Sequence, residues 1–289
     1  MRRQVMLLGG LCGLYELGGP SFCSGQAMRA FSASRPIASE RFLHVTLDFA
    51  GGTLAVVPGT DGQLYGLKLR YDADHSTPVQ QYDPRTGILR LGVESTGGTG
   101  LRVSSRAQLE QTARVEFSPD IPLVLYANLG AGDATLNLGN MTLTELDLRS
   151  TATRAHVDFS QPTRGVCKSA TFTVAAAELD VHHLAHAGCG AIRVSGAVGA
   201  VTLSFDGAWQ RDATLAVDLS MGGLTLRVPR GNGVRVTAER FLAPFNGDGF
   251  TRNGNTWTTP GFDQAPHKLR VELKAAMVGI EIKWIEDRR

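Results

Sequence analysis

The chain has 289 residues, of which 43% are hydrophobic and 19% charged, with 34 glycines and 12 prolines. A chain of this composition can bury a substantial core, which excludes the disordered, fibrous and multi-spanning classes. Its 29 lysines and arginines against 27 aspartates and glutamates leave a formal charge of +2. Because a surface that tracks phosphates needs a clear basic excess, nucleic acid is not an expected partner.

The first thirty residues have the three-part layout of a secretory signal peptide. A basic start precedes an apolar run over residues 5–15 and a small-residue segment, in which Gly25 and Ala27 fit the −3 and −1 positions of a signal peptidase site. The run is only about half the length that crosses a bilayer, so no stable transmembrane helix is expected. We therefore predict a leader over residues 1–30 and export to the periplasm, the cell surface or the medium.

Two alternatives to a cleaved leader stay open. Cys12 and Cys23 raise the possibility of a lipoprotein, although Leu11 and Phe22 precede them where a small side chain is usual. A start codon assigned too early would instead give a cytoplasmic product.

A repeat of about 22 residues runs through the middle of the chain. Five segments align without gaps, and their leading apolar residues are spaced by 21, 22, 22 and 23 positions: Leu136, Val157, Leu179, Val201 and Leu224. A small residue stands four positions before each of them: Gly132, Thr153, Ala175, Ala197 and Ser220. A fixed period of this length is typical of solenoids, in which the small residue fits a tight corner of every coil.

Each period of the repeat is expected to hold at least two strands. Apolar and polar residues alternate in the five segments, which is typical of a strand with one buried face. A second set of alternating segments falls between them, at residues 146–148, 171–174, 192–194 and 215–217. No sustained 3.6-residue period is present. The fold class is therefore predicted to be all-β, a right-handed β-solenoid of the single-stranded β-helix type, with an antiparallel β-sandwich as the alternative.

The predicted organisation has three parts. After the leader, residues 41–122 carry strand patterns with a looser period and form an N-terminal β subdomain. Residues 123–289 form the β-solenoid, which contains an aromatic loop at 241–262 and ends in two closing strands near 269–273 and 280–284.

Several of these residues together resemble a known family, the bacterial toast-rack domains of LiaF-type cell-envelope stress regulators and of related proposed adhesins. The resemblance covers roughly residues 41–284. It is carried by the repeated coils and by residues 205–209, 226–229, 241–245, 249–251, 255–257 and 279–282. It implies a solenoid-like all-β domain outside or at the membrane, without enzymatic activity, that takes part in sensing, adhesion or protein contact.

A histidine-rich segment and two cysteines are the candidate ligand and cross-link residues. His182, His183, His186 and Cys189 have side chains that bind zinc at such spacings, but no second cysteine pair completes a familiar site, so an exposed polar corner is favoured and no metal is expected. Cys167 and Cys189 are one period apart. They are candidates for a disulfide between adjacent coils if the chain is exported, or for two buried thiols if it is not.

The aromatic loop is the other candidate binding feature. Five aromatic residues stand close together in it: Phe241, Phe245, Phe250, Trp257 and Phe262. A solenoid end exposes apolar coil interior and needs a cap, which is the favoured interpretation. The alternative is a ligand-binding platform formed by Phe245, Phe250, Trp257 and Phe262.

No catalytic residue and no cofactor are predicted. Asp147, Asp158, Asp180 and Asp206 alternate with inward residues and are expected to face solvent, so roles in calcium binding or acid–base catalysis are disfavoured. Nucleophile-elbow, phosphate-loop, zinc-protease and dinucleotide motifs are absent from the sequence.

The leading functional hypothesis is a non-enzymatic, exported module that binds an envelope protein, lipid or glycan. A secreted β-helix enzyme or binding protein for carbohydrate is the second hypothesis. A scaffold that polymerises through its coil ends is the third, and the sequence leaves the oligomeric state open.

Overall fold

A computed structural model describes residues 28–96, 103, 105–239, 245–246 and 249–286 of the chain. Residues 1–27 of the predicted leader and Phe241 lie outside these residues, whereas Met28, Arg29 and Ala30, which the predicted leader also includes, belong to the first strand. In the described part the structure is all-β: a single mostly parallel sheet holds the strands, and the helical turns are short 3₁₀ segments. The prediction of an all-β solenoid is therefore confirmed.

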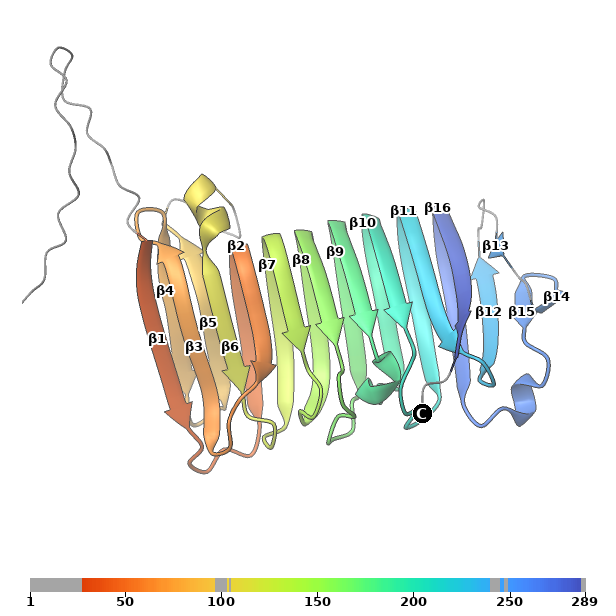
Figure 1. The fold of residues 1–289 in the computed structure, drawn as a ribbon, viewed down its shortest axis with the longest axis horizontal. Helices are drawn as coiled ribbons and strands as arrows, with labels where there is room; N and C mark the ends of the chain where they lie inside the picture. Colours follow the sequence, from red (N-terminus) through yellow and green to blue (C-terminus); the bar gives the residue numbers. More distant parts are fainter. Residues whose placement is uncertain (1–27, 97–102, 104, 240–244, 247–248, 287–289) are drawn as a thin grey trace, which may run out of the picture.

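The strands follow one another along an elongated row (Figure 1). The N-terminal strands are β1 (Met28–Pro36), β2 (Leu43–Pro58), β3 (Gln63–Asp72), β4 (Ser76–Asp83), β5 (Ile88–Ser95) and β6 (Thr112–Phe117). The long central strands are β7 (Leu123–Asn137), β8 (Leu143–Asp158), β9 (Ser169–His182), β10 (Ala191–Ser204), β11 (Ala213–Pro229) and β16 (Lys268–Ile285). The remaining elements are β12 (Gly233–Glu239), β13 (Phe245–Asn246), β14 (Thr251–Asn253), β15 (Thr256–Thr258) and the turns η1 (Arg106–Glu110), η2 (Leu184–Ala187) and η3 (Phe262–Gln264).

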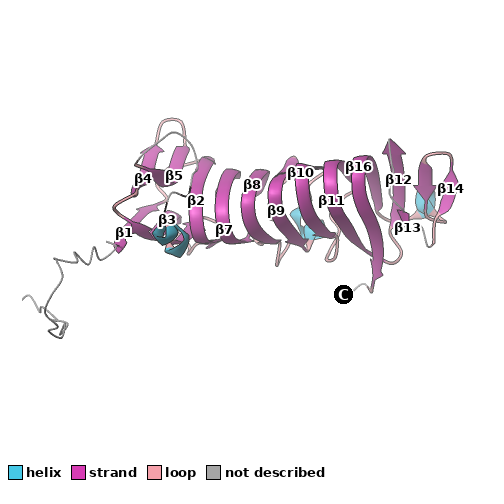
Figure 2. Ribbon diagram, turned by 90° about the horizontal axis from the view of Figure 1, so that it is seen from above, coloured by secondary structure: helices cyan, strands magenta, loops and turns pink. Residues whose placement is uncertain are grey.

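Each central coil consists of one long strand and the loop that follows it, as the view from above shows (Figure 2). The prediction of two separate strands per period is wrong for these coils, because the two alternating segments are the two halves of one strand. In β7, the inward residues Leu125 and Leu136 belong to different halves and are both fully buried. A positive φ of 117° at Gly132 lies between them. A strand that changes direction at one residue keeps both halves paired with its neighbours.

The register of the coils differs from the predicted alignment at one step. Leu136 pairs with Val157, and Leu179 with Val201, as predicted. Val157, however, pairs with Val181 and not with Leu179. This coil is 24 residues long, and a two-residue shift leaves the same face of a strand buried, so the alternation in the sequence could not reveal it.

The C-terminal strand fills a gap inside the row of coils. The sheet order is β11-β16-β12, so β16 lies between two strands that precede it in the chain. The two predicted closing strands are the two halves of β16. Beyond β12 the sheet continues into the antiparallel β15 and β14, and at the other end β6 is followed by the antiparallel β3 and β1. Antiparallel strands thus cover both ends of the parallel stack, which would otherwise expose coil interior.

The predicted division at residue 122 does not interrupt this sheet. β2 belongs to the N-terminal part and pairs in parallel with β7 along its whole length. On its other side, β2 pairs with β5 along its first half and with β6 along its second half. The core is likewise continuous from Leu43 to Ile282.

Candidate functional site

A cleft of about 1100 Å³ lies along the edge where four neighbouring parallel strands end. β9 ends at His182, β10 at Ser204, β11 at Pro229 and β16 at Ile285, and the loops that leave these strands form its walls. We call it the loop-edge cleft. Its lining residues are His182, His183, His186, Ser204, Asp206, Gly207, Ala208, Trp209, Arg227, Arg230, Gly231, Asn232, Pro266, His267, Ile285 and Glu286.

His183 is held between two carboxylates from different coils. Its Nδ1 lies 2.7 Å from Oδ1 of Asp158, and its Nε2 lies 3.2 Å from Oδ2 of Asp206. The backbone N–H of His183 also donates to Asp206, at 3.0 Å. The residue has a left-handed backbone, with φ 52°. A non-glycine residue rarely adopts this conformation, and here the contacts on both sides of the ring hold it in place.

The charge on Asp206 is stabilised within this arrangement. Partial burial acts to raise the pKa of Asp206, but hydrogen bonds from the Ser204 side chain and the His183 N–H, together with the charge of His183, outweigh it. The pKa of Asp206 therefore lies below its ordinary value. This carboxylate is therefore ionised at neutral pH and acts only as a hydrogen-bond acceptor.

His186 packs in parallel with His183, with ring centroids 5.6 Å apart. Its Nδ1 lies 2.8 Å from the carbonyl oxygen of Phe159, which can only accept, so Nδ1 carries the proton of this hydrogen bond. Gly207 lies directly against the same ring, because a Cβ at that position would come within 2.6 Å of Nε2 of His186. The His186 ring is therefore fixed in orientation by its neighbours.

An aromatic stack forms the wall of the cleft near the C-terminal end. The rings of Phe205, Trp209 and His267 follow one another with centroids 5.8 Å apart at each step. Phe205 is fully buried and His267 is half-buried, so the stack leads from the core to the cleft. Among the described residues, Nε1 of Trp209 is buried without a hydrogen-bond partner.

Two arginines supply the fixed positive charges of the cleft lining, in which Asp206 and Glu286 carry the negative ones. Arg227, the outward neighbour of Lys283 on β16, has no ion-pair partner within the described residues. Arg230 is exposed, and its Nε lies 3.9 Å from the carboxylate of Glu286, which is more exposed still. Ion pairs of this kind contribute little, so both guanidinium groups can engage a ligand.

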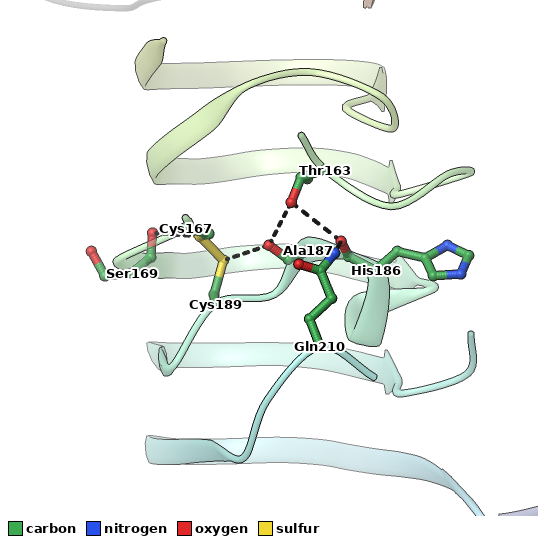
Figure 3. Close-up of a disulfide and its surroundings, with 7 residues drawn as sticks. All are labelled: Thr163, Cys167, Ser169, His186, Ala187, Cys189 and Gln210. Carbon is green, nitrogen blue, oxygen red and sulfur yellow. Dashed lines mark hydrogen bonds between the residues drawn. A yellow bond between two sulfur atoms is a disulfide. The ribbon is translucent and has the colours of Figure 1, made fainter. Parts of the chain in front are cut away.

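The structure separates the three weak metal candidates of the sequence. His182 and His186 both line the cleft, whereas Cys189 forms a disulfide with Cys167, with their Cα atoms 4.5 Å apart. Figure 3 shows the ring of His186 directed away from this disulfide. Thr163 and Gln210 both donate to the carbonyl of His186 and join three successive loops around it (Figure 3).

Reduction of the disulfide is expected to lower the free energy of unfolding by about 3 kcal/mol, since the bridge closes a loop of about 22 residues in the unfolded chain. Urea unfolding with and without reductant measures the loss. The double variant Cys167→Ala, Cys189→Ala should be insensitive to reductant. The prediction is contradicted if the wild type has the same urea midpoint with and without reductant. It is contradicted likewise if Cys167 and Cys189 react with an alkylating reagent before any reductant is added, because the disulfide is then absent.

The aromatic residues of the 241–262 loop lie at the end of the solenoid. Phe250 stacks on Trp284 with a centroid distance of 5.7 Å, and Phe262 is buried beneath the guanidinium of Arg235 at 4.1 Å. Trp257 packs partly buried against the core, and Phe245 pairs through its backbone with Ile280. Phe250, Trp257 and Phe262 do not line the loop-edge cleft. A role of the four residues as a ligand platform stays a prediction.

Sequence reasoning missed the contacts of His183 with Asp158 and Asp206. In the predicted alignment Asp158 lay beside Asp180, which suggested a row of solvated carboxylates. In the structure Asp158 lies beside His182, two residues further along β9. The signal that could have revealed these contacts is the length of this coil, 24 residues. The alternating pattern does not show it, because a two-residue shift leaves the alternation unchanged.

Comparison with known proteins agrees with the architecture. Residues 28–169 match a family model described as the N-terminal domain of toast_rack. No curated protein matches the chain. A proposed cell adhesion protein from Clostridium sporogenes ATCC 15579 has a similar structure, with a TM-score of 0.50 and 16% identity over 90% of this chain and 100% of its own. A proposed adhesin from Bacteroides fragilis NCTC 9343 has a TM-score of 0.40 and 10% identity over 90% of this chain and 99% of its own.

Within the described residues, no helix is long and apolar enough to cross a bilayer. The family match ends at residue 169, where β9 begins, and the same sheet continues from there without a break through β16. The family match and the fold agree, and residues 28–169 therefore form a toast-rack N-terminal domain.

Proposed function

We propose that this protein is an exported, non-enzymatic binding module that holds an acidic glycan of the cell envelope in the loop-edge cleft. The observation that carries the proposal is the convergence of Arg227 and Arg230 with four histidines at the ends of neighbouring strands. Guanidinium groups recognise carboxylates with paired hydrogen bonds, and the imidazoles of His182 and His267 offer further N–H donors, whereas both ring nitrogens of His183 are engaged by Asp158 and Asp206. An extended polymer of uronic acids presents such carboxylates at regular intervals.

The carboxylates of the cleft favour binding over hydrolysis. A glycosidase needs two carboxyl groups free to act on the substrate, one of them protonated. Asp206 is engaged by His183, and its lowered pKa keeps it ionised. Glu286 is exposed beside Arg230. Asp206 therefore lacks the protonated character of a general acid, and Glu286 lacks the burial that would produce it.

Export is supported by two features of the chain. The Cys167–Cys189 disulfide is typical of oxidising compartments outside the cytoplasm. The first thirty residues have the composition of a secretory leader. The naming of the Clostridium sporogenes neighbour as a proposed cell adhesion protein is consistent with a place at the cell surface.

Binding of alginate oligosaccharides, measured by calorimetry beside neutral dextran, tests the proposal. We expect alginate to bind and dextran not to bind. The variant Arg227→Ala, Arg230→Ala should weaken alginate binding about tenfold or more, which corresponds to a loss of about 1.4 kcal/mol. Arg70→Ala, at an exposed arginine on β3, is the matched control and should bind as the wild type does.

Three outcomes would contradict the proposal: binding of neither polymer, equal binding of both, or equal weakening in the control. Release of reducing ends or unsaturated sugars from alginate would show an enzyme in place of a binding module.

A further inference from the structure

The geometry points to a divalent transition-metal site, best suited to Zn²⁺, formed by His156, Asp180 and His182 on the outer face of the sheet. One ligating atom from each residue lies within 4.8 Å of the other two. This set differs from the histidine–cysteine combination that the sequence suggested, and it does not depend on the proposed function.

The sheet itself places the three side chains together. His156 on β8 and Asp180 on β9 are direct neighbours in the parallel ladder. His182 follows Asp180 by two residues, so its side chain leaves the same face of β9. The rings of His156 and His182 are 4.9 Å apart, and Nε2 of His182 lies 3.9 Å from Oδ1 of Asp180. Both strands are held by neighbours on either side, which fixes the backbone of the cluster.

The two imidazoles of the cluster are not committed to other partners. His75, His183 and His186 each have a hydrogen bond from Nδ1 within 2.8 Å. In the part of the chain that the structure describes, the rings of His156 and His182 have no such bond. Imidazoles of this kind keep their lone pairs available to a metal.

The donor set and the local charge suit zinc. Two histidines and one carboxylate provide three of the four ligands of a tetrahedral site, with a fourth position left for water or a ligand. Bonds of about 2.0–2.2 Å place the ligands of tetrahedral zinc about 3.4 Å apart. The His182–Asp180 separation of 3.9 Å exceeds this by about 0.5 Å, and the ligating atoms of the set lie up to 4.8 Å apart, so side-chain rotations that bring them closer by at most about 1.4 Å complete the site.

Charged groups around the cluster do not oppose a cation. Asp158 lies beside His182 in the ladder and is paired with His183, whose ring centroid is 6.3 Å from that of His182. Arg154, two residues before His156 on the same face, is paired with Asp133 at 3.3 Å and with Glu178 at 3.2 Å. These neighbouring charges are therefore paired with one another and do not repel a bound dication.

Calorimetric titration of the untagged, chelator-treated full chain with ZnCl₂ tests this site. We expect one zinc ion per chain. His156→Ala and His182→Ala should each weaken binding at least about 100-fold, because loss of an outer-shell partner alone costs about 10- to 100-fold. His44→Ala, at an exposed histidine of β2, is the matched control and should leave the affinity unchanged.

Two further measurements keep the test decisive if an alanine variant folds poorly. Asp180→Asn preserves the shape of the side chain and should also weaken binding. The wild type loaded with Co²⁺ should show the intense visible bands of four-coordinate cobalt. A stoichiometry far below one, an affinity unchanged in His156→Ala and Asp180→Asn, or a loss of binding in His186→Ala alone would overturn the proposal.

Discussion

Gly222→Ala is expected to destabilise the protein by more than about 3 kcal/mol. Gly222 lies at the bend of β11 with φ 129°, a conformation that costs an L-residue about 1–3 kcal/mol. A Cβ there would also overlap the carbonyl oxygen of Gly199 on the neighbouring coil. The backbone strain and the steric overlap both lower the stability of the folded state. The overlap can be relieved only if the two coils move apart, which weakens the hydrogen bonds between β10 and β11.

The adjacent glycine provides a matched control. Gly223 has no positive φ, and a Cβ added to it meets no atom within 4 Å. Gly223→Ala should therefore be neutral or stabilise the protein by about 0.4–1 kcal/mol, because alanine lowers the conformational entropy of the unfolded chain. Urea unfolding of both variants measures the difference. Similar stabilities for the two would show that the bend tolerates a side chain.

Phe172→Ala is expected to cost about 3–5 kcal/mol, the range for removal of a fully buried aromatic ring. Phe172 on β9 is completely buried and lies between Leu148 on β8 and Val194 on β10. A coil of a solenoid contacts only its neighbours, so a cavity in a central coil weakens the coupling between both halves of the stack.

Unfolding in urea, followed by circular dichroism, provides the measurement for Phe172→Ala. Val198→Ala is the control, because Val198 on the neighbouring strand is 47% exposed, and its loss should change stability by less than about 0.5 kcal/mol. A loss below about 1 kcal/mol for Phe172→Ala would mean that the coil collapses around the missing ring. A smaller slope of the unfolding free energy against urea concentration in this variant would indicate that the stack unfolds in parts.

The candidate site shows where sequence reasoning reached its limit. The alternation around Val157 and Val181 identified the buried face, yet the pairing partner of Asp158 depended on a two-residue choice that alternation leaves open. With the wrong choice, Asp158 and Asp180 formed a row of acids. With the observed register, Asp158 reaches His183, and Asp180 stands beside His156.

The sequence by itself determined the fold class, the length of a coil to within two residues and the inward face of each strand. These properties follow from local patterns, namely a period of two along a strand and a spacing that brings Cys167 beside Cys189. They need no knowledge of distant contacts. The small residues expected at the bends are right for Gly132 and Thr153, but Ala175, Ala197 and Ser220 lie two positions before the residues that occupy the bends.

Only the tertiary structure decided the register of the 24-residue coil and the place of β16 between β11 and β12. Both choices depend on how much apolar surface distant segments bury against each other, which a local pattern does not encode. The loop-edge cleft and the cluster of His156, Asp180 and His182 arise from these choices, because each joins residues from different coils.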